Sequence, residues 1–294
     1  MSLALIVLLC GVGAALLSFA ISAARGIKVD PVDPAAEERA VRRWMHRHPR
    51  VERFLRARLD RKTAGGFLLT ASFLVLFGVA ITLGLLLDAI NDHSWLATAD
   101  KSVADWGSHH GRSQTIDLLR WVTQLGSSLV VTAALIVTAA ADYVRRRSLE
   151  VFAFVAAVGI GELLLSNVLK QIVSRDRPAV LHLVVAHGYS FPSGHTVAAA
   201  SAWSAIALVI GRDRPRWARA TFAGLAALIA VCVAASRALL GVHWLTDVIA
   251  GLAVGWGWFT IVAIIFGGRA QRLGDPVAEH PVGVPEQPRV AARS

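Results

Sequence analysis

The sequence predicts an all-α, multi-pass transmembrane helix bundle. Of the 294 residues, 55% are hydrophobic and only 17% are charged, whereas soluble globular proteins contain roughly 25% charged residues. The apolar residues form runs with few or no charges, each long enough for a helix to cross a bilayer. These runs are continuous and do not alternate with polar residues, which favours helices over the strands of a membrane barrel.

Seven such runs follow one another along the chain. The predicted spans are 1–24, 63–87, 121–141, 151–173, 196–210, 220–236 and 246–266. The first has no charged residue, and no basic segment precedes it, so we interpret it as a retained helix and not as a cleaved signal peptide. Residues 88–120 are expected to form a long loop between the second and third spans.

The formal net charge of +10 comes from basic residues that gather between spans. They concentrate in 25–62, 145–147, 212–219 and 269–272, which fall on one side if seven spans alternate. The positive-inside rule makes that side cytoplasmic, with the N-terminus outside and the C-terminus inside, in the plasma membrane. This distribution explains the charge without a nucleic-acid partner.

The segments outside the spans are expected to differ in character. Residues 25–62 contain twelve Lys and Arg and are predicted to form a basic cytoplasmic linker, whereas 269–294 are rich in proline and are predicted to be a disordered cytoplasmic tail. The two cysteines, Cys10 and Cys232, lie in apolar runs and are interpreted as small buried hydrophobic residues.

Polar residues interrupt the apolar pattern in three places, which alternation of the spans brings to the outer face. The residues concerned are Lys170, Arg177 and Pro178, then Pro192, Ser193, Gly194 and His195, then Ser236, Arg237, His243 and Asp247. Polar groups at membrane depth are costly and usually functional. Three cations beside two imidazoles and a carboxylate predict an anion site, most simply a phosphate site.

Each group has a chemical reason to be there. Arg177 offers a planar fork to phosphate oxygens, whereas Lys170 acts as a point charge. The Pro-Ser-Gly turn at 192–194 can direct backbone N–H groups and a hydroxyl toward an anion at a helix start. His243 and Asp247 are four residues apart, so a helix would place them on one face, with the carboxylate fixing the tautomer of the imidazole. The other ring nitrogen would then be free to attack.

These residues resemble the signature of the type 2 phosphatidic acid phosphatase (PAP2) superfamily. The matching patterns are Lys-x6-Arg-Pro at 170–178, Pro-Ser-Gly-His at 192–195, and Ser-Arg-x5-His-x3-Asp at 236–247. The resemblance covers 63–268 and implies a six-helix core of this type, to which 1–24 adds one N-terminal helix.

The resemblance also implies roles for the site residues. His243 would be the nucleophile that forms a phosphohistidine, Asp247 would orient it, and His195 would protonate the leaving group and then activate water. The phosphoryl oxygens would be bound by Lys170, Arg177, Ser193, Gly194 and Arg237. No metal and no cofactor is implied, because the cations supply the positive charge.

The function expected from this reading is hydrolysis of a lipid phosphate or diphosphate at the outer face of the membrane. An outward-facing site favours undecaprenyl diphosphate, with phosphatidylglycerol phosphate and phosphatidic acid as further candidates. A lipid phosphotransferase using the same phosphohistidine is the alternative, ahead of a vanadate-dependent haloperoxidase or a non-catalytic transporter. Nothing in the sequence indicates an oligomeric state.

Three further polar residues carry weaker expectations. Glu162, in the middle of the fourth span, is interpreted as an interhelical hydrogen-bonding group before a functional one. Arg175 and Asp176 lie inside the first pattern but are not signature positions, and are expected to form a local ion pair or a rim that contacts substrate.

Overall fold

The computed structural model describes residues 11–16, 64–91, 95–110 and 113–267, and this part of the chain contains helices and no strand. From residue 64 onward the helices are α4 (Ala64–Asn91), α5 (Trp95–His110), α6 (Ser113–Gln124), α7 (Ser128–Arg146), α8 (Glu150–Val173), α9 (Gly194–Gly211), α10 (Arg216–Leu239) and α11 (Leu245–Gly267). The predicted all-α membrane fold class is confirmed.

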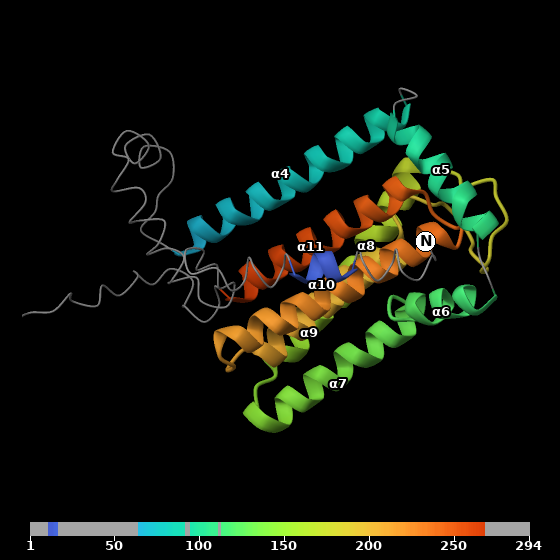
Figure 1. Cartoon of the computed structure of the whole chain (residues 1–294). Coiled ribbons are helices and arrows are strands. Elements are labelled where there is room, and N and C mark those ends of the chain that lie inside the picture. The colour runs from blue at the N-terminus through green and yellow to red at the C-terminus, as the bar shows by residue number, and fades with distance from the viewer. Residues whose placement is uncertain (1–10, 17–63, 92–94, 111–112, 268–294) are drawn as a thin grey trace, which may run out of the picture.

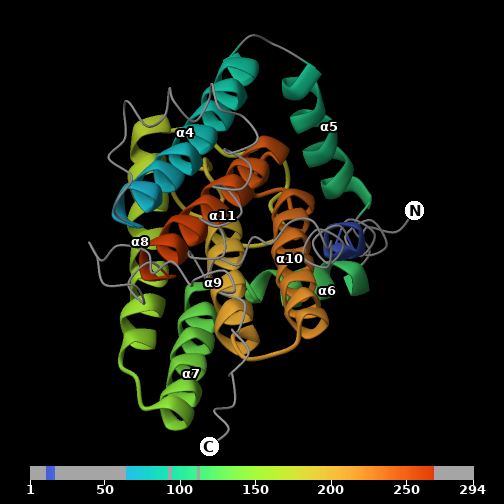
Figure 2. The same ribbon diagram turned by 90° about the vertical axis from the view of Figure 1, so that its left-hand side faces the viewer.

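Helix α9 lies at the centre of the bundle and contacts α7, α8, α10 and α11 (Figures 1 and 2). Most of its eleven buried residues are small, and five of them are alanines. Small residues let helix backbones approach closely inside a membrane. Gly255 of α11 shows how close the approach is, because a Cβ there would lie 2.6 Å from the carbonyl oxygen of Val197.

The outer helices direct large apolar side chains away from the bundle. Phe73 of α4, Leu129 of α7 and Ile172 of α8 are 64%, 82% and 72% exposed. In water such a surface would be unfavourable, but lipid chains solvate it. Together with the length of the helices, these outward apolar faces place the bundle in a bilayer.

The predicted spans agree best with the structure over the second half of the chain. Helices α8 to α11 cover the four spans predicted from residue 151 onward, with ends that differ by a few residues. Among the described residues, five helices are long and apolar enough to cross a membrane, and α4 has a shorter apolar stretch at Ser72–Asp88. The number of seven spans therefore stays a prediction.

The boundary predicted for the third span is wrong. Residues 121–124 belong to α6, and α7 begins only at Ser128, after a turn. Ser127 occupies the N-cap position, and its hydroxyl accepts a hydrogen bond from the backbone N–H of Val130. Such a cap defines a helix start, and the Gly-Ser-Ser stretch at 126–128 marks it within an uncharged part of the sequence.

The expectation of a loop over 88–120 is also wrong, because most of this segment forms α5 and the start of α6. Neither helix has a long apolar run, but α5 buries Asp100, Ala104 and Gly107, which follow the spacing of one helical face. A Cβ on Gly107 would lie 2.5 Å from the carbonyl oxygen of Leu239, so α5 packs directly on the end of α10. Tertiary packing, and not hydrophobic composition, stabilises these helices.

Only part of the N-terminal predictions can be compared with the structure. Residues 11–16 of the predicted first span are helical, and Gly11 packs so closely on α10 that a Cβ would lie 2.5 Å from Sγ of Cys232. The rest of that span, the predicted linker at 25–62 and the predicted tail at 269–294 lie outside the described residues.

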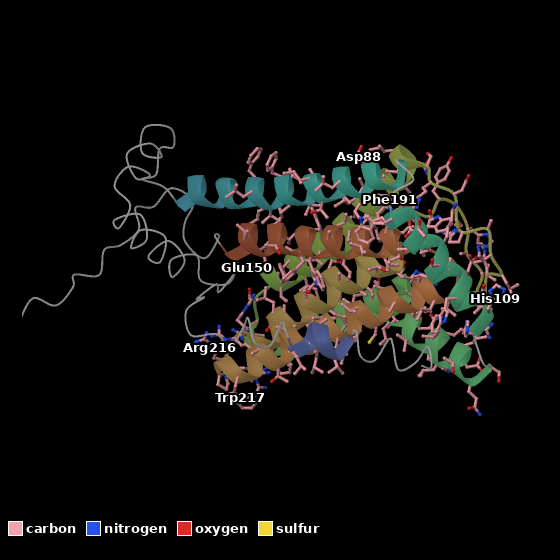
Figure 3. The ribbon with its side chains drawn as sticks, turned by 45° about the horizontal axis from the view of Figure 1, so that its top comes forward. Asp88, His109, Glu150, Phe191, Arg216 and Trp217 are labelled. Carbon is pink, nitrogen blue, oxygen red and sulfur yellow. The ribbon has the colours of Figure 1, made fainter. Side chains whose placement is uncertain are left out.

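The two ends of the bundle differ in chemistry. Figure 3 shows Asp88, His109 and Phe191 toward one end and Glu150, Arg216 and Trp217 toward the other. The first end holds the junctions α8–α9 and α10–α11, where the predicted site residues lie. The second holds the α7–α8 and α9–α10 turns with their arginines, where Arg146 pairs with both Asp142 and Asp213. We call these the site end and the arginine end.

Gly126, in the turn between α6 and α7, controls how that turn packs on α9. A Cβ at this position would lie 2.5 Å from the carbonyl oxygen of His195 and 2.7 Å from Cγ1 of Val233. Because the neighbours are packed backbone and core, Gly126→Ala is expected to destabilise the protein by about 1–3 kcal/mol. Thermal unfolding in detergent measures this loss. Gly84→Ala is the matched control, because a Cβ there meets no atom within 4 Å, and an equal loss in both variants would contradict the packing argument.

Candidate active site

Lys170 lies in the last turn of α8, which ends in a left-handed cap. Ser174 has a φ of 49°, and its N–H donates to the carbonyl oxygen of Lys170, so the chain leaves the helix at this point. Pro178 then disfavours a helical conformation at Arg177. We call the segment 174–193, which connects α8 to α9, the outer strap. Its two ends are held together by Ser190, whose backbone N–H and hydroxyl both donate to the carbonyl oxygen of Arg175.

The start of α9 lies beside this lysine. Ser193 occupies the N-cap position, and its backbone N–H donates to the carbonyl oxygen of Asp247 over 3.1 Å. Its hydroxyl oxygen accepts from Oγ1 of Thr196 at 3.0 Å. Nζ of Lys170 is 3.6 Å from the position that a Cβ on Gly194 would take. A cation therefore lies beside the N-terminal turn of a helix, where backbone N–H groups already favour anions.

His243 and Asp247 lie together at the start of α11, but not on one continuous helix as expected. Gly241 has a φ of +74° and breaks the chain after α10, and α11 begins only at Leu245. Oδ2 of Asp247 accepts from the N–H of Trp244 at 2.9 Å, which is the return bond of a capping box. The same oxygen lies 3.5 Å from Nδ1 of His243, a contact longer than an ordinary hydrogen bond.

The contacts of His243 assign its tautomer. Nη1 of Arg177 lies 3.3 Å from Nε2 of the imidazole. Because a guanidinium can only donate, Nε2 must carry the lone pair and Nδ1 the proton, which then faces Asp247. The network therefore assigns the tautomer predicted from sequence, with the lone pair of Nε2 on the side of the cations.

Burial keeps His243 neutral. The side chain is 2% exposed, and this burial lowers the pKa of His243 to about 4. The contact with Asp247 raises the pKa, whereas the charges of Arg237 and Arg177 lower it. At neutral pH the imidazole is thus an uncharged base with an available lone pair.

None of the three predicted cations has a carboxylate partner among the described residues, and Arg237 and Lys170 also lack the backbone carbonyl acceptors that Arg177 has. Arg237 is 5% exposed, its Nε is buried without a hydrogen bond, and its Nη1 makes only a 3.4 Å contact to Oγ1 of Thr123. Lys170 likewise has no ion pair within this part of the chain. Buried cations are costly unless an anion accompanies them, so this arrangement is suited to binding an anion.

The sequence predicted that the guanidinium of Arg177 would be free to bind phosphate oxygens, but most of its N–H groups bind the backbone. Its guanidinium donates to the carbonyl oxygens of Gly188, Val242, His187 and Tyr189 at 2.9, 2.6, 2.9 and 3.4 Å. These bonds tie the outer strap to the segment before His243. Only the Nη1 group beside Nε2 of His243 is directed at the reacting nitrogen.

The predicted site residues are brought to one end of the bundle from α8, the outer strap, α9, α10 and the start of α11. His195, in the first turn of α9, feels the charges of Arg237, Lys170 and Arg177 and interacts with His243, so the three sequence patterns form a single electrostatic cluster. Glu162 is buried on α8 two helical turns before Lys170 and stands apart from this cluster.

Sequence reasoning missed two participants and underrated a third. Asp100 of α5 and Thr246 of α11 are buried at the site and hydrogen-bond to each other. The local ion pair expected for Arg175 and Asp176 is not found among the described residues, and Arg175 pairs with Asp247 and Asp100 instead. The only local signal for Asp100 was its position on the same face of α5 as Ala104 and Gly107.

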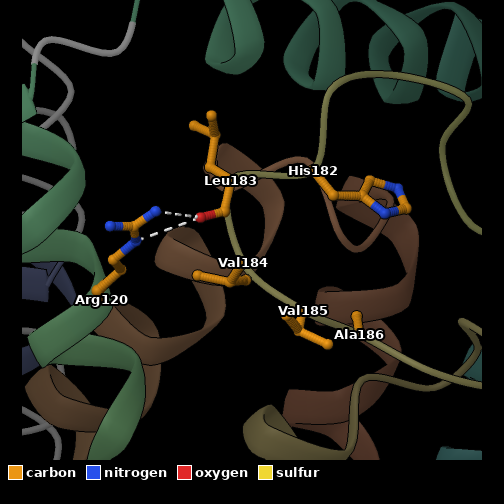
Figure 4. Close-up of a pocket in the computed structure, with 6 residues that line it drawn as sticks. All are labelled: Arg120, His182, Leu183, Val184, Val185 and Ala186. Atoms are coloured by element: carbon orange, nitrogen blue, oxygen red, sulfur yellow. Dashed lines mark hydrogen bonds between the residues drawn. The ribbon is translucent and has the colours of Figure 1, made fainter.

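A surface pocket of about 420 Å³ lies over the outer strap, and its lining does not include His243 or Asp247 (Figure 4). It is lined by Arg120, His182, Leu183, Val184, Val185 and Ala186. Arg120 donates from Nε and Nη2 to the carbonyl oxygen of Leu183 and so fastens the strap to α6. We assign this pocket no catalytic role.

Known proteins with the same arrangement were found by sequence and by structure. The sequence profile described as the PAP2 superfamily matches residues 148–270. A phosphatidylglycerophosphatase B of Bacillus subtilis (strain 168) is 31% identical over 149 residues, which are 50% of this chain and 72% of that protein. A lipid A 1-phosphatase of Rhizobium etli is 34% identical over 112 residues, but the match spans only 44% of that protein.

A solved structure is also similar. The crystal structure described as the first transmembrane PAP2 type phosphatidylglycerolphosphate phosphatase, from Bacillus subtilis, superposes with a TM-score of 0.59 at 28% identity. The superposition covers 63% of this chain and 92% of that one. The likeness therefore extends over nearly the whole of the solved protein and leaves about a third of this chain outside it.

Proposed function

Because this chain belongs to the PAP2 superfamily, we propose that it is an integral membrane phosphatase that hydrolyses a lipid phosphate or diphosphate. The observation that carries the proposal is a pair of cations, Lys170 and Arg237, that have no carboxylate partner among the described residues and share one electrostatic cluster with the neutral His243. A phosphoryl group would balance this charge and bring its phosphorus to Nε2 of His243. Simple anion binding needs no such nucleophile.

The first half of the reaction transfers the phosphoryl group to the protein. Nε2 of His243 attacks phosphorus, the bond from phosphorus to the lipid oxygen breaks, and that oxygen leaves with the electron pair. When the leaving group is an alkoxide, His195 enters this step protonated, a form that the negative charge of the bound phosphoryl group stabilises, and it gives the leaving oxygen its proton. The developing positive charge on the imidazole is balanced by Asp247 beside Nδ1.

The second half releases phosphate. His195, now without its proton, accepts one from a water molecule, and the resulting hydroxide attacks the phosphorus of the phosphohistidine. The P–N bond breaks and returns its electron pair to Nε2. Throughout, Lys170, Arg237 and the N–H groups at the start of α9 stabilise the charge on the phosphoryl oxygens, as preorganised donors do.

The candidate substrates share a phosphate at the end of a lipid. An outward-facing site favours undecaprenyl diphosphate, whereas the names of the relatives favour phosphatidylglycerol phosphate or another membrane phospholipid. Phosphatidic acid remains the simplest member of the class. All three present the same phosphoryl oxygens, so a direct comparison of rates assigns the substrate.

The orientation of the site is part of the same proposal. The arginine end carries Arg145, Arg146 and Arg147 and the cluster at 212–219, whereas the site end lies across the bundle from it. By the positive-inside rule the arginine end is cytoplasmic. The active site would then face the outside of the plasma membrane.

A panel of lipids tests the proposed function. Purified protein in mixed micelles, given each of the three lipids, is expected to release free phosphate from at least one of them. Addition of EDTA is expected to leave the rate unchanged, because Lys170 and Arg237 supply the charge that a metal otherwise provides. Absence of free phosphate with every lipid would refute the phosphatase, and appearance of the phosphate on a second lipid would indicate the phosphotransferase instead. A large loss of rate in EDTA would refute metal independence.

The pH dependence follows from the state of His243. Because its pKa is lowered to about 4, the nucleophile stays unprotonated through the range in which an ordinary histidine, with a pKa near 6.5, becomes charged. After correction for the ionisation of the substrate phosphate, we expect kcat/KM to remain level as the pH falls to about 5 and to decline only near pH 4, since this ratio reports the free enzyme and the free substrate. An acid limb centred near pH 6.5 would show that the free imidazole is solvated.

A further inference from the structure

A second cluster of charges lies directly behind His243 and includes its partner Asp247. Nη1 of Arg175 donates to Oδ1 of Asp247 at 2.6 Å, and its Nη2 donates to Oδ2 of Asp100 at 2.8 Å. The side chains of Asp247 and Asp100 are 0% and 2% exposed, and that of Arg175 is 15% exposed. One guanidinium therefore bridges two buried carboxylates that come from helices α11 and α5.

Both carboxylates are also fixed by the start of α11. Asp100 accepts from the backbone N–H of Thr246 at 2.8 Å and from its hydroxyl at 2.7 Å, while Asp247 accepts from the N–H of Trp244. These donors belong to the N-terminal turn of the helix, which has unsatisfied N–H groups and a partial positive charge. The position of each carboxylate oxygen is thus determined by more than one bond.

Arg175 is held in place from its other side as well. Its guanidinium lies over the ring of Trp244, with 5.2 Å between Cζ and the ring centroid. The indole Nε1 of the same tryptophan donates to the carbonyl oxygen of Asp176 over 2.9 Å. The outer strap and the segment that carries His243 are therefore locked together around this arginine.

The charges of the cluster have a consequence for His243. If Asp247 were paired with Arg175 alone, its negative charge would be largely cancelled where the imidazole feels it. Asp100 provides a second carboxylate, so the two aspartates and one arginine keep a net charge of −1 behind His243. That charge opposes the positive charge that develops on the imidazole as it attacks phosphorus.

We propose that Arg175 and Asp100 are positioning residues for the nucleophile: Arg175 fixes Oδ1 of Asp247 so that Oδ2 faces His243, and Asp100 preserves the negative charge that the arginine would otherwise cancel. This inference rests on the proposed function for its catalytic meaning. It makes α5, expected from the sequence to be part of a loop, a structural component of the active site.

Three variants separate this role from a merely structural one. Arg175→Gln removes a positive charge and Asp100→Asn removes a negative one, whereas the double variant R175Q/D100N removes both and leaves Asp247 with the net charge of the native cluster. We expect Arg175→Gln to reduce kcat by about 100-fold, because the carboxylate loses its alignment. We expect the double variant to recover the part of that loss that arises from repulsion between Asp247 and the unpaired Asp100, but not the part that arises from lost alignment.

The titration of His243 provides a readout that does not depend on turnover. It is followed by NMR of the protein labelled with ¹⁵N-histidine, with the signal assigned by its loss in His243→Asn. Arg175→Gln is expected to raise the midpoint by about one pH unit, Asp100→Asn to lower it by a similar amount, and the double variant to return toward the native value. The charged and titratable groups around this imidazole are Asp247, Arg237, Arg177, His195, Lys170, Arg175 and Asp100.

The control is an ion pair of the same kind at the arginine end. Nε of Arg146 lies 2.9 Å from Oδ1 of Asp142 within α7, and Asp142→Asn is expected to leave both kcat and the His243 titration unchanged. If both site variants lose activity only in proportion to the folded protein, and neither moves the midpoint, the positioning role is wrong. If the midpoints move in opposite directions but no lipid yields phosphate, the positioning role stands and the proposed function fails.

Discussion

Replacing His243 by alanine is expected to lower the rate of phosphate release by at least about four orders of magnitude, because removal of a catalytic nucleophile disables the whole covalent route. The effect should lie in kcat, since the cations that bind the phosphoryl group remain. The measurement is the initial rate of free phosphate release from the lipid that the panel identifies.

His109 provides the matched control for this variant. It lies at the end of α5, where its Nδ1 contacts only local groups of the same helix, so His109→Ala is expected to keep the native rate. Thermal unfolding in detergent should show that His243→Ala remains folded. Turnover in the folded His243→Ala protein within tenfold of the native rate would contradict the assignment of the nucleophile.

Arg237→Met is expected to lower kcat/KM by about 10²–10³-fold while leaving the protein as stable as before, or more stable. The loss reflects one charged donor to the phosphoryl oxygens. The stability reflects the removal of a buried cation for which the described part of the chain provides no carboxylate partner and no hydrogen bond to Nε, since a buried charge without partners is unfavourable. The fall in kcat/KM should therefore occur without a fall in the melting temperature.

Arg177→Met gives the contrasting result. Its guanidinium donates to four backbone carbonyl oxygens, so its loss leaves these acceptors without partners and should reduce stability together with activity. A fall in the melting temperature of Arg237→Met as large as that of Arg177→Met would show that Arg237 holds the fold and not the substrate.

The second half of the fold could be predicted from the sequence because its helices end at strong local signals. Ser174 and Gly241 adopt positive φ where α8 and the segment after α10 turn, and uncharged runs lie between such points. The start of α7 was missed because Gly126 and its cap, Ser127, carry no charge and so did not interrupt the predicted span. Helices α5 and α6 were missed because contacts with α10 stabilise them, and hydropathy does not record such contacts.

The residues of the candidate site could be predicted from the sequence, but some of their contacts could not. The order and spacing of the three patterns predicted which residues gather at one end of the bundle. They did not predict that Arg177 donates its hydrogen bonds to backbone carbonyl oxygens, because those bonds depend on the path of the outer strap. Asp100 could not be found, since its partners Arg175 and Thr246 are 75 and 146 residues away in the sequence.

The central claim is that phosphorus becomes bonded to Nε2 of His243, and a trapping experiment tests it most directly. In His195→Ala the general base for water attack is absent. A substrate whose leaving group needs no proton, such as an aryl phosphate or a lipid diphosphate, should therefore phosphorylate the enzyme faster than the phosphohistidine is hydrolysed. We predict that mass spectrometry of the acid-labile product places one phosphoryl group on the peptide that contains His243, and that it disappears in H195A/H243A. A phosphoryl group on any other residue, or turnover of such a substrate with no trapped phosphoryl group, would contradict the account.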